Sequence, residues 1–178
     1  MKTKLMIGIG AALAIGLSAC SKDEGQGVVE NSAEQAALAG LVISEKPADA
    51  VSIVQLRKQA KAGDTVTFTG HALGSRSVFV DGRAVMIMGD PEVLISCSLI
   101  EGDNCSTPWD VCCEDPDEIK ASIVTVQVLD GEGKIIKAGL KGVAGITELS
   151  DLTIVGEVAE KSTDDNMLIN ATAIYLNQ

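Results

Sequence analysis

The sequence contains very few aromatic residues. Phe68, Phe79, Trp109 and Tyr175 are all of them, so a hydrophobic core must be built mainly from Val, Ile and Leu. Basic residues are also scarce, because 14 Lys and Arg stand against 25 Asp and Glu, for a formal net charge of −11. Proteins that hold single-stranded nucleic acid combine a basic groove with stacking aromatic rings. The composition has neither feature, and we do not expect nucleic acid as a partner.

Histidine and recognisable catalytic motifs are the next shortages. His71 is the only histidine, and it follows a strand-like stretch, where a structural or surface role is the usual one. Residues 73–77 do not fit the G-x-S-x-G nucleophile elbow, and the sequence has no H-E-x-x-H and no G-x-x-x-x-G-K-[ST] motif. No nucleophile–base pair is visible. We therefore expect a protein without catalytic activity and without a cofactor.

The N-terminus carries a positive and then apolar pattern. Lys2 and Lys4 precede an apolar stretch at 5–17, which is shorter than the roughly 20 residues that span a bilayer but typical of a signal peptide. The stretch ends in Leu17-Ser18-Ala19-Cys20, which resembles the lipobox of bacterial lipoproteins. The resemblance implies that residues 1–19 are a signal peptide and that Cys20 carries the lipid. The alternative is an ordinary signal peptide with an incidental cysteine.

The same resemblance implies a location. Two or three acyl chains on one cysteine would anchor the protein stably to a membrane, which one chain would not. Ser21 follows Cys20, in place of the Asp that marks retention in the inner membrane of enteric bacteria. We expect a protein of the cell envelope that is lipid-anchored to the outer membrane and faces the periplasm or the exterior.

The rest of the chain divides into a spacer and one domain. Residues 20–47 begin with polar residues and glycine, which favours a flexible tether between lipid and domain. Residues 48–178 are enough for one domain with its own core. Within the domain, apolar residues at helical spacing predict an amphipathic helix at 48–62, ended by Gly63.

Period-two alternation of apolar residues predicts the strands. The expected strands are 65–70, 77–88 with a turn or bulge at Asp81-Gly82, 122–129, a short 134–138, 152–158 and 167–176; a brief helix is expected at 142–149. This order resembles that of an OB-fold. The resemblance implies an all-β fold with small α content, a five-stranded Greek-key barrel preceded by one helix. OB-folds usually bind oligonucleotides or oligosaccharides, but a fold does not by itself define a function.

The cysteines that remain after Cys20 lie in one polar, cysteine-rich segment at 90–120. They are Cys97, Cys105, Cys112 and Cys113. An even number in an exported chain favours disulfides. A bond between two adjacent cysteines would close a strained ring, which leaves two pairings: 97–112 with 105–113, or 97–113 with 105–112.

The same four cysteines have two other interpretations. They could bind zinc or copper, with Met86 and Met88 upstream, although the C-x7-C-x6-C-C spacing lacks the C-x2–4-C pairs of structural zinc sites. A reactive thiol pair would favour C-x-x-C, which the sequence does not contain here. We expect disulfides and no bound metal, with the four-cysteine metal site as the alternative.

Two further features belong to this segment. The stretches 79–84 and 105–113 (C-S-T-P-W-D-V-C-C) resemble a motif of uncharacterised secreted bacterial proteins, which usually have an aromatic residue in place of Val111; the resemblance implies no activity. Trp109 is expected to pack the segment against the barrel, with a role as a binding anchor as the alternative. The acidic run 114–118 is interpreted as solvated; the alternative is a Ca²⁺ site built from its carboxylates, although the run lacks the loop pattern of an EF-hand.

These observations favour a non-catalytic envelope module. It would use the barrel surface and the Cys/Trp segment to hold an envelope protein or a glycan. The alternative is a metal-handling lipoprotein that uses the cysteines.

Overall fold

The computed structural model describes residues 25–102 and 104–177; the expected signal peptide and Cys20 lie outside the described residues. The elements in chain order are α1 Gly25–Gly40, β1 Val51–Ser52, α2 Ile53–Gln59, β2 Thr65–His71, β3 Val85–Gly89, the 3₁₀ turn η1 Cys97–Leu99, α3 Pro116–Ser122, β4 Ile123–Gln127, the 3₁₀ turn η2 Val143–Gly145, β5 Asp151–Val158 and β6 Leu168–Leu176. In the part of the chain that is described, no helix has the length and apolar character needed to cross a membrane.

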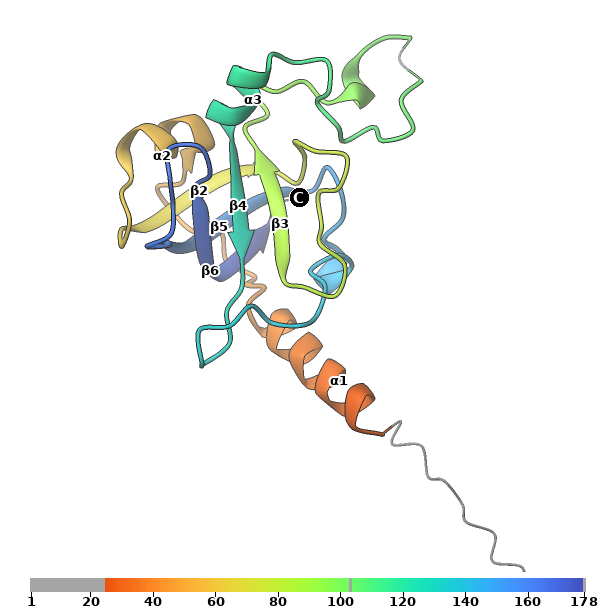
Figure 1. Cartoon of the computed structure of the whole chain (residues 1–178), viewed down its shortest axis with the longest axis vertical. Coiled ribbons are helices and arrows are strands. Elements are labelled where there is room, and N and C mark those ends of the chain that lie inside the picture. The colour runs from red at the N-terminus through yellow and green to blue at the C-terminus, as the bar shows by residue number, and fades with distance from the viewer. Residues whose placement is uncertain (1–24, 103, 178) are drawn as a thin grey trace, which may run out of the picture.

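Five strands close into a barrel (Figure 1). The order around the barrel is β2, β3, β4, β6, β5 and back to β2, where the pairing runs from Thr65 opposite Glu157 to His71 opposite Asp151. Within the barrel all neighbours are antiparallel except β4 and β6, which are parallel, and the short β1 adds to β2 as a second parallel pair. The expected all-β fold, a five-stranded Greek-key barrel with few helices, is confirmed.

The strands exist because their apolar residues alternate. In β2 every second residue from Val66 is buried, and the next buried one, Phe68, is fully enclosed in the core. Val124 and Val126 of β4 point into the same core from the opposite wall. Aliphatic side chains fill nearly all of the interior, as the scarcity of aromatic residues predicts.

Gly156 lets strand β5 bend. The register between β5 and β6 shifts between Val155 and Gly156, which is the signature of a β-bulge. A Cβ atom on Gly156 would lie 2.6 Å from the carbonyl oxygen of Asn170, closer than two such atoms can approach. Glycine is therefore required where the sheet curves to close the barrel.

The N-terminal boundary of the domain differs from the expected one. Leu38, near the end of α1, is fully buried in the barrel core. Val42 then forms a parallel bridge with Ile174 of β6, and the Ile43 amide donates to the Ile174 carbonyl at 2.9 Å. The folded domain thus begins before residue 48, and the expected flexible tether does not extend to residue 47. The physical reason is that the apolar residues in the second half of 20–47, such as Leu38, pack on the barrel. The prediction of a tether was based on the polar residues at the start of that segment.

Two other predicted elements are shorter in the structure. The helix expected at 48–62 is α2, where Ser52 caps the N-terminus by accepting from the Gln55 amide at 3.3 Å, and residues 51–52 pair with β2 instead. The stretch 77–88 is a hairpin: its turn at Asp81-Gly82 brings Phe79 opposite Met86 before β3 continues. Both differences arise because local periodicity does not locate the ends of elements.

Candidate functional site

Residues 90–120, here called the cysteine loop, connect β3 to β4. The loop projects from the end of the barrel where β3 ends and β4 begins, and α1 leaves the barrel at the opposite end (Figure 1). It contains η1 and most of α3, but no strand among its described residues. It is the longest connection between consecutive barrel strands. Loops carried on a rigid scaffold are where binding residues collect.

Asp90 holds the base of the loop to the barrel. Its side chain is about 1% exposed, and its carboxyl oxygens accept from the Val54 amide of α2 at 3.0 Å and from the Glu92 amide at 3.1 Å. Its own amide donates to the Ser122 carbonyl at 2.9 Å, which joins the two ends of the loop. One buried residue therefore links α2, the start of the loop and its return into β4.

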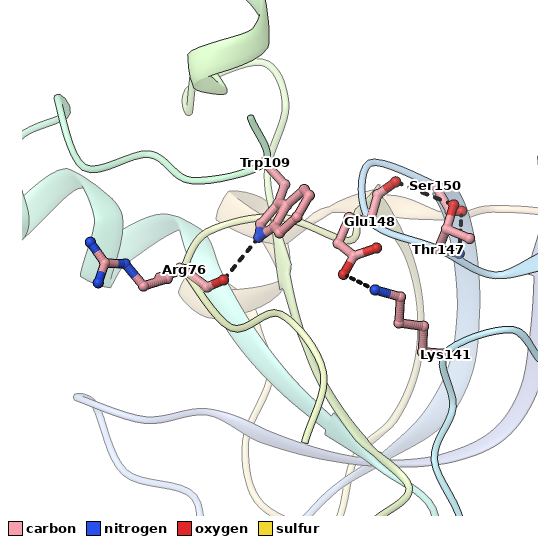
Figure 2. A network of polar contacts seen from close by, with 6 residues as sticks. All are labelled: Arg76, Trp109, Lys141, Thr147, Glu148 and Ser150. Atoms are coloured by element: carbon pink, nitrogen blue, oxygen red, sulfur yellow. Dashed lines mark hydrogen bonds and ion pairs between the residues drawn. The ribbon is translucent and has the colours of Figure 1, made fainter. Parts of the chain in front are cut away.

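A small second core lies beneath the loop. Leu73, Leu94 and Val111 are buried together, apart from the barrel core. Trp109 packs against both cores, and its indole Nε1 donates to the Arg76 carbonyl at 2.9 Å (Figure 2). Trp109 thus lies at the contact between the loop and the barrel, where the packing role was expected.

A second segment reaches the same place. Leu149 packs against the small core, and just before it Glu148 forms an ion pair with Lys141 at 2.6 Å (Figure 2). Burial alone would raise the pKa of Glu148, but the hydrogen bond and the charge of Lys141 hold it below its ordinary value. The Thr147 amide donates to Ser150 Oγ at 3.0 Å, which completes a tight turn. The segment 147–150, which packs against the same small core as Trp109, is therefore held by its own ion pair and hydrogen bond.

Three of the four cysteines come together in the loop. The Sγ atoms of Cys97, Cys105 and Cys112 all lie within 4.8 Å of one another, and those of Cys97 and Cys112 are 3.9 Å apart. Exposure increases across the group, since Cys97 is buried, Cys105 is half-buried and Cys112 is exposed. Cys113 is exposed and lies outside this group.

Backbone pairing inside the loop produces this grouping. The Cys97 amide donates to the Asp110 carbonyl and the Ser98 amide to the Pro108 carbonyl, both at 2.9 Å, so the first half of the loop runs beside the second. Cys105 Sγ lies 3.3 Å from Thr107 Oγ1, at the turn that carries Trp109. Residues separated by up to 15 positions in the chain are thereby brought to one point.

The expected disulfides stay predictions. The Sγ atoms of Cys97 and Cys112 are 3.9 Å apart, which is longer than the roughly 2.05 Å of a sulfur–sulfur bond. These two cysteines are nevertheless partners in the first of the two expected pairings, 97–112 with 105–113. Met86 and Met88, which the sequence offered as further sulfur ligands, are fully buried in the barrel core and do not belong to the group of three cysteines.

The loop also exposes large apolar side chains. Leu99 is 76% and Ile95 50% exposed, and Val93 and Ile100 are exposed as well. Among the other large apolar residues of the described chain, only Val80 is also exposed. Between Arg83 and Lys120 the sequence has acidic residues and no basic one, so the residues that flank this apolar group along the chain carry only negative charge. A cluster of exposed apolar residues on one projection is typical of an interaction surface.

Sequence reasoning missed helix α3 and this apolar group. Asp115 caps α3 by accepting from the Asp117 amide at 2.8 Å and the Glu118 amide at 3.3 Å, and Pro116 occupies the first turn. The acidic run thus forms the N-terminus of a helix, where negative charge is stabilised. The dipeptide Asp115-Pro116 was the available signal, because Asp before Pro commonly starts a helix. For the exposed apolar group, the available signal was the pairs Leu94-Ile95 and Leu99-Ile100 within an otherwise polar segment.

The remaining residue singled out in the sequence is His71. It ends β2, in register with Gly89 of β3 and with Asp151 of β5. Its place is therefore on the barrel wall.

Comparison of the chain with protein-family models, with curated proteins and with solved structures gave no match.

Proposed function

We propose that this protein is a lipid-anchored envelope protein that binds a partner through the cysteine loop and catalyses no reaction itself. The observation that carries the proposal is the group of exposed apolar side chains on the loop, Leu99 foremost. Exposing such side chains costs solubility, and several of them on one loop are usually retained because a partner covers them. The signal sequence, the lipobox and Ser21 support anchoring through Cys20, on the outer membrane and facing the periplasm or the exterior.

The geometry supports a partner beyond the anchoring membrane. The loop and α1 leave the barrel at opposite ends (Figure 1), so a tether attached before α1 would direct the loop away from its own membrane. The exposed groups are aliphatic, and Trp109 is occupied by packing at the loop base. An aliphatic surface suits a protein partner better than a glycan, which is recognised through polar groups and exposed aromatic faces. The acidic surroundings disfavour nucleic acid.

The anchor is tested by Cys20→Ser. Cells labelled with a fatty-acid analogue should incorporate the label into the wild-type protein and not into the variant, because the acyl chains would be attached at this cysteine. The variant precursor should also retain its signal peptide and run at higher mass. Equal labelling of both proteins would place the lipid elsewhere.

The binding surface is tested by photo-crosslinking in cells. A photoreactive residue at Leu99 should give a discrete adduct, and the same residue at Glu132, in the exposed turn after β4, should give none. The matched control is Ile100→Ser in the Leu99 reporter protein, which should reduce the adduct because it removes apolar contact area beside the reporter. Adducts of equal yield at Leu99 and Glu132, or none at either position, would contradict the proposal.

A further inference from the structure

We propose that Cys97, Cys105 and Cys112 form a binding site for one thiophilic metal ion, Zn²⁺ or Cu⁺. The inference rests on the proposed role of the cysteine loop as the binding part of the protein, and it names a ligand for the inner side of that loop. It departs from the expectation of disulfides, and the reason is the arrangement of the sulfur atoms.

The spacing of the three sulfur atoms fits metal ligation. Two thiolates bound to a tetrahedral zinc ion, each at about 2.3 Å from the metal, stand about 3.8 Å apart. Cys97 and Cys112 are 3.9 Å apart, and Cys105 Sγ lies within 4.8 Å of both. A disulfide joins only two sulfur atoms and does not require a third beside them, whereas a metal ion brings three ligands to one point. Soft thiolate ligands select zinc and monovalent copper among the common metals.

The charge around the group favours a cation. Cysteine binds metal as the thiolate, so three ligands would bring three negative charges together. Between Arg83 and Lys120 the sequence has no Lys, Arg or His to balance them, and Lys120, the last residue of the loop, forms an ion pair with Asp165. A bound metal ion would supply that balance. The same acidic surroundings attract cations to the loop from solution.

The group is also reachable. Cys97 is buried at its inner side, and Cys112 is exposed at its outer side, so a metal ion can enter from solvent past Cys112. The backbone hydrogen bonds from Cys97 to Asp110 and from Ser98 to Pro108 hold the two halves of the loop in place. Binding would therefore require only small side-chain movements.

Metal titration of the purified lipoprotein tests the site. The full mature chain is isolated in detergent with reductant and without chelator, and Zn²⁺ and Cu⁺ are titrated separately against a competing chromophoric chelator. Native mass spectrometry should show one metal ion per chain with at least one of the two metals. Cys112→Ser should weaken binding at least 100-fold, beyond the roughly 10–100-fold that loss of an outer-shell partner costs. Cys97→Ser and Cys105→Ser should act alike.

Cys113→Ser is the matched control. It removes a neighbouring exposed cysteine outside the group and should leave affinity within about threefold of wild type, because that sulfur is not among the ligands. The exposed Cys112 is the variant least expected to disturb folding, and circular dichroism of each variant checks this. The proposal is overturned if the reduced chain binds neither metal, if Cys113→Ser weakens binding as much as Cys112→Ser, or if envelope-derived protein carries a Cys97–Cys112 disulfide and no metal. Crosslinking at Leu99 needs no metal. The proposed function can therefore fail or be supported independently of the metal site.

Discussion

Replacing Trp109 by alanine should lower the free energy of unfolding by about 2–4 kcal/mol, near the lower part of the range for removal of a packed aromatic ring. The ring contacts both the barrel core and the small core of Leu73, Leu94 and Val111, and it is partly exposed, which reduces the loss. Its hydrogen bond to the Arg76 carbonyl is lost as well. Urea unfolding followed by far-UV circular dichroism measures the change, because Trp109 is the only tryptophan and its fluorescence disappears in the variant.

Trp109→Phe separates packing from hydrogen bonding. Phenylalanine keeps most of the ring and removes the indole donor, so a loss of about 0.5–1.5 kcal/mol is expected. If Trp109→Ala is as stable as the wild type, the ring does not hold the loop to the barrel, and its alternative role as a binding anchor becomes the one to examine. The Leu99 crosslink would then be compared in the same variant.

Asp90→Ala should destabilise the protein by about 2–3 kcal/mol, because it removes the acceptor of two partly buried amides. Those amides belong to Val54 and Glu92, so α2 and the start of the cysteine loop both lose their connection. Hydrogen exchange should quicken at these two amides by more than in the centre of β4, where the ladder to β3 is unchanged. Urea unfolding gives the overall loss.

Asp90→Asn is the conservative comparison. Asparagine offers one acceptor oxygen in place of two, and its amide group would face one of the donors. The loss should therefore lie between those of wild type and Asp90→Ala. Equal stability of all three proteins would show that water replaces the carboxyl group at this position, and that the loop is held mainly by Trp109.

The barrel strands were the part of the fold most open to prediction. Alternation in 65–70 and 122–129 identified β2 and β4, because a strand with one face in the core has a period of two and a register shift by one residue would expose Phe68 or Val126. The glycine in 152–158 marked the bend that Gly156 supplies. The order of the strands then indicated the barrel, since few connections other than a Greek key close five strands in that order.

The cysteine loop was predictable in its position and composition but not in its shape. That four cysteines and Trp109 share one segment is plain from their numbers. Which sulfur atoms meet depends on the hydrogen bonds from Cys97 to Asp110 and from Ser98 to Pro108, and no local pattern in the sequence specifies them. Vicinal cysteines look equivalent in a sequence, yet Cys112 joins the group and Cys113 does not.

By itself, the sequence determined the strand pattern, the aliphatic core and the concentration of cysteines in one loop, because each depends on periodicity or composition that can be counted along the chain. Tertiary structure alone decided that Leu38 belongs to the barrel core, that Asp90 joins the loop to α2, and that three sulfur atoms lie within 4.8 Å. Each of these is a contact between residues far apart in sequence, whose free energy depends on the completed barrel and not on neighbouring residues.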